Sequence, residues 1–186
     1  MMKLDLCGAW EMFPDSGERI CTNVPGTVLS TLLEKGMIPD PFDGMNEREA
    51  CAETEKTWHF ERNFFVAAEQ LEEPHADLVF EGLDTLAEIT LNGQAVCRTD
   101  NMHRTWRIPV REYLRQGNNT LRITFRPALE YIRKAAEKHP EITYTGGSEL
   151  LWTGALRKAH YMFGWDWGPC LPDAGIWRAA RAEFFQ

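Results

Sequence analysis

The sequence lacks the features that would place it outside the ordinary globular proteins. It has no internal repeat, no low-complexity tract and no apolar run long enough to span a membrane. Hydrophobic residues make up 44% of the chain and charged residues 26%, which excludes collagen-like, disordered and membrane-spanning classes. Because 186 residues are enough to bury one sizeable core, we expect a single domain over residues 1–186.

The chain has fewer basic than acidic side chains. The chain has 20 Lys and Arg against 28 Asp and Glu, so its formal net charge is −8. Such a charge repels the phosphates of nucleic acids and of anionic membrane surfaces. We therefore expect neither a nucleic-acid partner nor a membrane partner.

Cysteine and histidine are sparse as well. The five cysteines are an odd number without a Cys-x-x-Cys pair, and the five histidines show no metal-ligand spacing. We expect reduced thiols, no metal and no cofactor. The first ten residues lack the apolar run of a secretory signal, which together with the thiols predicts a cytoplasmic protein. The cysteines are Cys7, Cys21, Cys51, Cys97 and Cys170.

The apolar pattern of the sequence predicts mainly short strands. Apolar residues alternate in several runs, and Asn92-Gly93 is the pair preferred in a type I′ hairpin turn. Helix is too scarce between the strands for βαβ units, so we predict an all-β fold, an antiparallel β-sandwich of jelly-roll type. The predicted strands are Thr57–Val66, Asp77–Leu83, Leu86–Leu91, Gln94–Arg98, Trp106–Val110, Leu121–Phe125 and Gly175–Phe185.

One or two short helices accompany the strands. Thr27 can cap a helix over Val28–Lys35, and Gly36 can end it. Pro127–Lys138 is the second candidate, since Pro127 suits a first turn. The apolar face predicted for the first helix consists of Val28, Leu29, Leu32 and Leu33.

Two stretches are predicted to be irregular. Prolines and a glycine among acidic residues indicate an ordered loop over Ile38–Asn46, and the charged run Glu47–Glu49 is typical of solvated surface. Tyr144–Trp177 holds four of the seven tryptophans without a regular period. Long aromatic-rich loops inside a domain are usually functional, so we expect this one to carry the site.

The centre of that loop is the run Phe163-Gly164-Trp165-Asp166-Trp167-Gly168-Pro169. Two indoles that bracket a carboxylate suit a sugar, because an apolar plane packs against the C–H face of a pyranose while the carboxylate accepts hydrogen bonds from its hydroxyls. The alternative is structural, with both indoles in the core and the carboxylate supporting a turn. Asn101 has the same two interpretations, as a ligand contact or as a turn residue.

The order of several short pieces resembles the N-terminal domain of β-mannosidases of glycoside hydrolase family 2. Some pieces are similar to the wider family, which includes β-galactosidases and β-glucuronidases, whereas the run from Phe163 to Pro169 points to mannosidases. The pieces are Trp10, Val24–Val28, Asp40-Pro41-Phe42, Trp58–Phe65, Phe80–Thr85, Leu91-Asn92-Gly93, Asp100-Asn101-Met102, Phe163–Pro169 and Gly175–Arg178.

The resemblance implies a galactose-binding-domain-like jelly roll, followed in the whole enzyme by immunoglobulin-like domains and a (β/α)₈ barrel with the two glutamates of a retaining mechanism. The chain stops at Gln186, so we expect those domains to lie outside it and this part alone to be inactive. The resemblance also implies that Trp165 and Asp166 contact the sugar in the −1 subsite and that Asn101 lies near it.

The expected function is therefore that of the N-terminal domain of a retaining β-mannosidase, which removes terminal non-reducing β-D-mannose from β-mannosides or manno-oligosaccharides. Its partner would be the catalytic barrel of the same polypeptide. Three alternatives remain open at this point. They are a free-standing carbohydrate-binding module, the same domain of a β-galactosidase or β-glucuronidase, and a packing domain that only braces the barrel.

Overall fold

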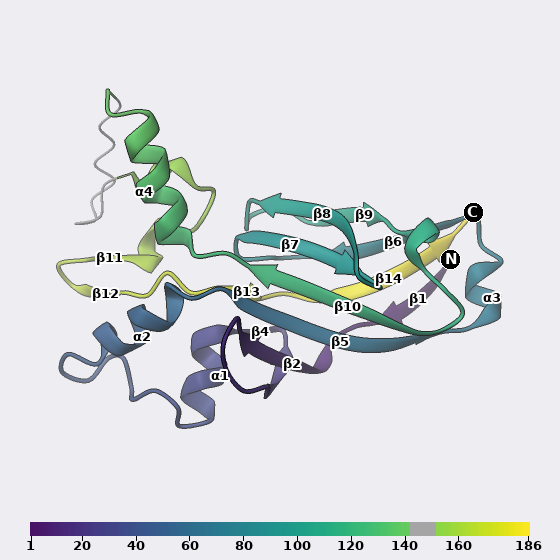
Figure 1. Cartoon of the computed structure of the whole chain (residues 1–186), viewed down its shortest axis with the longest axis horizontal. Helices are drawn as coiled ribbons and strands as arrows, with labels where there is room; N and C mark the ends of the chain where they lie inside the picture. Colours follow the sequence, from purple (N-terminus) through teal and green to yellow (C-terminus); the bar gives the residue numbers. More distant parts are fainter. Residues whose placement is uncertain (142–151) are drawn as a thin grey trace.

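The computed structural model describes residues 1–141 and 152–186 and consists of two layered β-sheets (Figure 1). The strand order is β1-β14-β6-β9 in one sheet and β3-β2-β5-β10-β7-β8 in the other, and every named pair is antiparallel. The predicted all-β antiparallel sandwich is confirmed. The strands are β1 (Met2–Asp5), β2 (Gly8–Pro14), β3 (Ile20–Val24), β5 (Trp58–Val66), β6 (His75–Phe80), β7 (Leu86–Leu91), β8 (Gln94–Asp100), β9 (Trp106–Pro109), β10 (Gly117–Phe125) and β14 (Ala180–Phe185).

The core lies between the two sheets and is built from alternate residues of their strands. In β5, Trp58, Phe60 and Phe64 are buried, as the alternation predicts. Phe60 meets Phe125 of the neighbouring strand edge to face, with ring centroids 5.4 Å apart. These aromatic contacts give the sandwich a rigid platform on which the segments at its end are mounted.

The predicted type I′ turn between β7 and β8 is confirmed. Asn92 and Gly93 have φ of 53° and 81°, so both central residues are in the left-handed region that this turn requires. The Asn92 side chain adds tertiary contacts, since its Nδ2 donates to the carbonyl of Tyr113 at 2.9 Å and to Oδ1 of Asn119 at 2.8 Å.

Two predicted helices are present as α1 (Val28–Glu34) and α4 (Ala128–Lys138). Thr27 caps α1, because its Oγ1 accepts a hydrogen bond from the Ser30 backbone N–H at 3.3 Å. One residue of the predicted apolar face differs: Leu33 is 42% exposed, because it faces outward at the end of the helix instead of the core.

Two further helices were not predicted, α2 (Glu47–Thr54) and the single turn α3 (Ala68–Leu71). The acidic run Glu47–Glu49 lies in the first turn of α2, where negative charge favours a helix. Only Ala50 and Thr54 of α2 are buried, so its sequence carries no apolar stripe that would reveal it. Within the described residues, no helix is long and apolar enough to cross a membrane.

The predicted closing strand is split in two. β13 (Gly175–Ile176) pairs with the short β4 (Gly26–Thr27), and only then does the chain enter β14. The two backbones approach closely, since a Cβ on Gly175 would lie 2.5 Å from the carbonyl oxygen of Gly26. A glycine is required at this crossing.

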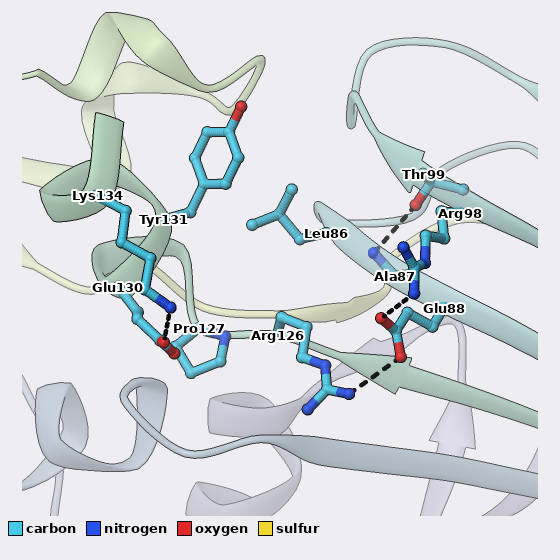
Figure 2. A pocket seen from close by; sticks show the side chains of 10 residues that line it. All are labelled: Leu86, Ala87, Glu88, Arg98, Thr99, Arg126, Pro127, Glu130, Tyr131 and Lys134. Carbon is cyan, nitrogen blue, oxygen red and sulfur yellow. Dashed lines mark hydrogen bonds and ion pairs between the residues drawn. The ribbon is translucent and has the colours of Figure 1, made fainter. Parts of the chain in front are cut away.

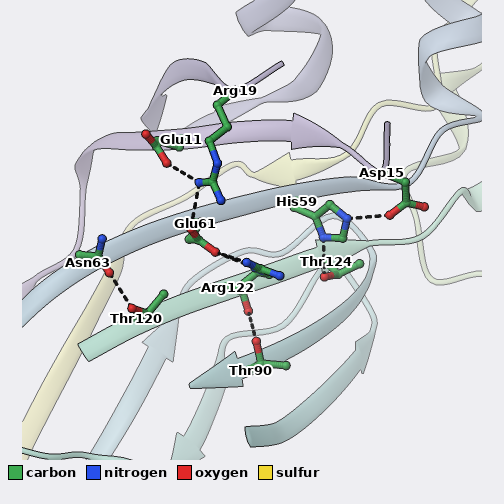
Figure 3. A network of polar contacts seen from close by, with 10 residues as sticks. All are labelled: Glu11, Asp15, Arg19, His59, Glu61, Asn63, Thr90, Thr120, Arg122 and Thr124. Carbon is green, nitrogen blue, oxygen red and sulfur yellow. Dashed lines mark hydrogen bonds and ion pairs between the residues drawn. The ribbon is translucent and has the colours of Figure 1, made fainter. Parts of the chain in front are cut away.

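The outer face of the six-stranded sheet carries a polar network (Figure 3). Arg19 donates to Glu11 and Glu61, and Arg122 donates to the other oxygen of Glu61 at 2.7 Å. Burial raises the pKa of the Glu61 carboxyl, but the hydrogen bonds from the two arginines outweigh it and hold that pKa below its usual value. The Arg19 guanidinium also lies over the Phe13 ring, 4.2 Å from its centroid. The arginines and glutamates of this network are therefore paired with one another.

Candidate functional site

The described part of the predicted functional loop forms a β-hairpin. Residues 142–151 lie outside the described residues, and they include the first part of the predicted loop Tyr144–Trp177. After two short 3₁₀ turns, Thr153–Ala155 and His160–Met162, the strands β11 (Phe163–Trp165) and β12 (Gly168–Cys170) pair antiparallel. The hairpin extends beyond the end of the sandwich and contacts α2 (Figure 1).

Trp165, Asp166 and Trp167 form the exposed tip of this hairpin. The two tryptophans are 43% and 81% exposed, and Asp166 is exposed between them. Their ring centroids lie 5.0 Å apart with planes tilted by 41°. Neither indole is therefore a core residue. Within the described part of the chain, no hydrogen bond or ion pair engages the Asp166 carboxylate, so it does not brace the turn.

The root of the hairpin is buried, whereas its tip is exposed. Phe163 is 2% exposed and packs in a small second core with Leu129 and Ile132 of α4. Gly164 has φ of +78°, and a Cβ there would lie 3.2 Å from the backbone of Cys170 across the hairpin. A buried root fixes the direction in which the tip points, so the aromatic rings and the carboxylate are presented on a rigid support.

The tip has both surfaces that a pyranose needs. Indole rings provide apolar planes, and an ionised carboxylate accepts hydrogen bonds from adjacent hydroxyls more strongly than a neutral acceptor does. A large exposed apolar group usually marks an interaction site when it is held on an ordered element. The arrangement is suited to binding a sugar.

Asn101, the third predicted site residue, lies in a turn at the end of β8. Its side-chain Oδ1 accepts from the His103 backbone N–H at 2.9 Å, and its carbonyl accepts from Trp106 Nε1 at 3.0 Å. It also forms a parallel bridge with Arg157. In the described residues no hydrogen bond or ring contact joins Asn101 to Trp165 or to its neighbours at the tip. The turn interpretation accounts for its Oδ1.

A buried ion pair that sequence reasoning missed holds the hairpin segment to the sandwich. Lys158 Nζ lies 2.7 and 2.6 Å from the two carboxylate oxygens of Asp84 and 2.6 Å from the carbonyl oxygen of Asp173. The side chains of Lys158 and Asp84 are 0% and 2% exposed. Burial lowers the pKa of the Lys158 ammonium, although the Asp84 charge opposes that shift. The sequence gives no clear signal of it, because Lys158 stands between Arg157 and Ala159 in a mixed polar and apolar run.

The carboxylate of Asp173 ties the same segment to α1. It accepts hydrogen bonds from the backbone N–H groups of Leu29 at 3.0 Å and Ala174 at 2.7 Å. Burial raises the pKa of this carboxyl, and these hydrogen bonds oppose the rise. The chain leaving the hairpin is thus fastened at Asp173, whose carbonyl contacts Lys158 and whose carboxylate contacts α1, before it reaches β13.

An apolar hollow of about 410 Å³ lies between α1, the loop that follows it and the hairpin. Leu33, Phe42, Tyr161 and Pro169 line it. Phe42 and Tyr161 are 75% and 81% exposed, so the hollow is rimmed by aromatic rings that face solvent. It forms the exposed apolar surface next to the candidate sugar site.

A second groove, of about 520 Å³, runs between α4 and strands β7 and β8 (Figure 2). Its charges are paired with one another, since Glu88 accepts from Arg126 at 3.0 Å and lies 3.3 Å from Arg98. Lys134 and Glu130 form a further pair on α4. None of the predicted site residues lines this groove.

Over residues 1–141 and 152–186, no group of three or more His, Cys, Asp and Glu side chains is arranged to hold a metal ion. All five cysteines have free thiols.

The fold and the matched residues define the class of protein. The family described as glycosyl hydrolase 2 galactose-binding domain-like matches residues 10–178. The chain therefore belongs to this family of β-sandwich domains. This membership confirms the resemblance that the sequence pieces suggested.

Known relatives narrow the class further. The chain is 37% identical over 180 residues to β-mannosidase B of Emericella nidulans, covering 93% of this chain and 21% of that protein. It is equally identical to β-mannosidase B of Thermothelomyces thermophilus, of which it covers 20%. The crystal structure of a β-D-mannosidase from Dictyoglomus thermophilum superposes with a TM-score of 0.93 at 35% identity, over 99% of this chain and 23% of that one. The chain is thus homologous to the N-terminal domain of β-mannosidases, rather than of β-galactosidases or β-glucuronidases, and spans about a fifth of its relatives' length.

Proposed function

We propose that this chain is the substrate-recognition domain of a retaining β-mannosidase that removes terminal non-reducing β-D-mannose from β-mannosides and manno-oligosaccharides. The observation that carries the proposal is the exposed tip of Trp165, Asp166 and Trp167 on a hairpin with a buried root. The homology to β-mannosidases supports the choice of sugar. We also propose a cytoplasmic location, in keeping with the free thiols.

Sugar recognition follows from what the tip can offer. Asp166 accepts hydrogen bonds from sugar hydroxyls, and a hydrogen bond to a charged group contributes about 1.5–3 kcal/mol. Trp165 packs an indole plane against the C–H face of the ring. We assign these two residues to the −1 subsite and give Asn101 a supporting position near it, since its Oδ1 is already engaged in a turn.

The chemistry belongs to another part of the polypeptide in this proposal. A retaining glycosidase needs an acid/base and a nucleophile with carboxyl groups about 5–5.5 Å apart. The relatives are about five times as long as this chain, which leaves room for a catalytic barrel in the same polypeptide. The apolar hollow lined by Phe42 and Tyr161 is the surface that we assign to contact with that barrel, because it adjoins the hairpin that must reach the barrel mouth.

The decisive experiment uses the full-length enzyme with Asp166→Ala and a matched control. We expect kcat/KM for an aryl β-mannoside to fall at least about 100-fold, since each 1.4 kcal/mol of lost binding to the transition state is tenfold. The melting temperature should barely change, because Asp166 is exposed. Glu69→Ala removes a carboxylate that is also exposed, on α3 at the opposite end of the sandwich, and should change neither quantity (Figure 1).

Two outcomes would overturn the proposal. Melting lowered by several degrees with kcat/KM within twofold of wild type would make Asp166 a structural residue. A full-length protein that hydrolyses aryl β-galactosides or β-glucuronides in preference to β-mannosides would refute the choice of substrate.

A further inference from the structure

Two of the five cysteines meet where α2 contacts the root of the hairpin. Cys51 lies in α2 and Cys170 ends β12, and these two elements are in contact. Their thiols interact, since each is the main cause of the shift in the pKa of the other. Both are half-buried and free, so each is partly accessible to a small reagent.

Packing holds both cysteines in place. Cys51 lies against the second core, which includes Phe163 at the root of the hairpin. Phe163 is also the strand partner of Cys170, and the close approach of Gly164 fixes the Cys170 backbone. The two thiols are therefore neighbours because helix and hairpin share one core.

The thiols differ in acidity. The hydrogen bond from Cys170 lowers the pKa of Cys51 to about 7, although burial and the charges of Glu55 and Glu47 oppose the shift. The hydrogen bond and burial raise the pKa of Cys170. Burial also raises the pKa of Cys97. At neutral pH about half of Cys51 is a thiolate, the nucleophilic form, and the other two are thiols.

We propose that Cys51 and Cys170 are a redox-active pair that closes to a disulfide between α2 and β12 in the presence of glutathione disulfide. The pair lies apart from the sugar contacts at the tip, so this inference goes beyond the proposed function. The disulfide would fasten the root of the hairpin covalently to α2.

The reaction is a double thiol–disulfide exchange. The Cys51 thiolate attacks one sulfur of glutathione disulfide, which forms a mixed disulfide and releases one glutathione thiolate. Cys170 then loses its proton and its sulfur attacks the Cys51 sulfur, so the mixed disulfide breaks and a second glutathione leaves. Two protein thiols are oxidised and one glutathione disulfide is reduced to two glutathione thiols.

Mass spectrometry of the purified chain tests this proposal. After incubation with excess glutathione disulfide at neutral pH, alkylation and digestion, we expect one peptide to join Cys51 to Cys170, whereas other accessible thiols such as the exposed Cys21 form only mixed disulfides with glutathione. Cys97→Ser, which removes another half-buried thiol, should cross-link as the unaltered chain does. Without oxidant, the alkylation rate of Cys51 should rise as the pH increases through about 7.

Single substitutions distinguish the role of Cys51, which attacks glutathione disulfide, from that of Cys170, which attacks the mixed disulfide. Cys170→Ser should stop at a mixed disulfide between Cys51 and glutathione. Cys51→Ser should take up glutathione more slowly than Cys170→Ser does, because burial still raises the pKa of Cys170 after the contact with Cys51 is lost. Recovery of all five alkylated cysteines after oxidation, or a cross-link between any other pair, would overturn the proposal.

Discussion

Lys158 and Asp84 form an ion pair that water does not reach, although 74 residues separate them in the sequence. Asp84 precedes β7 in the sandwich, whereas Lys158 lies in the segment that leads to the hairpin. The pair therefore joins the platform to the candidate site. Its removal is the sharpest test of how the site is held.

Lys158→Met should destabilise the chain by about 3–5 kcal/mol, because it leaves the Asp84 carboxylate buried without its partner. Urea unfolding measures this free energy. Lys56→Met is the matched control, since Lys56 pairs with Glu53 at 2.7 Å but is 50% exposed. Exposed pairs contribute at most about 1 kcal/mol. Equal effects of the two substitutions would contradict the anchoring role.

Acid should weaken the four-stranded sheet through Glu183 of β14. The side-chain hydrogen bond from Arg181 is the main reason that the pKa of Glu183 lies below its ordinary value of 4.5; burial opposes it, and Arg107 adds to it. Since the unfolded state binds the proton more tightly, this network stabilises the fold above about pH 4.5 and loses its contribution as the pH falls through the lowered pKa. Glu183→Gln should flatten the dependence of stability on pH in that acidic window, as measured by urea unfolding. An unchanged slope would contradict the role of Glu183.

Truncation should affect stability much less at the hairpin tip than at its root. Trp167→Ala removes an exposed ring and should change the free energy of unfolding by less than about 1 kcal/mol. Phe163→Ala empties part of the second core and should cost about 3–5 kcal/mol. Urea unfolding of both variants checks the contrast. If Trp167→Ala were the more destabilising, the tip would be a packing element and not a binding surface.

The chain expressed alone should fold, because its strands enclose a continuous core. It should release no nitrophenol from an aryl β-mannoside, since the proposal assigns both catalytic glutamates to the barrel. Mannose should bind at about millimolar Kd or weaker, because half a pocket leaves much of the sugar hydrated. A titration calorimeter would detect micromolar binding, which would favour a free-standing binding module.

Local patterns predicted much of this fold and only part of its site. Alternation identified β5, and the backbone demand of a type I′ turn identified Asn92-Gly93. The sequence did not predict α2, because the buried residues of this helix are small or polar and leave no periodic apolar signal. The run from Phe163 to Pro169 marked the candidate segment, but its hairpin form and the pairing of Lys158 with Asp84 depend on contacts between distant parts of the chain.

The position of β14 has a consequence for synthesis on the ribosome. It lies between β1 and β6, where Met2 pairs with Phe184 and Ala76 with the same residue on the other side. β6 is translated about 100 residues before β14, which at about 5–20 residues per second is roughly 5–20 s. During that interval the nascent chain presents two unpaired strand edges, the kind of surface that chaperones cover and that other nascent chains can join. Translation thus delivers last the strand that the four-stranded sheet needs at its centre.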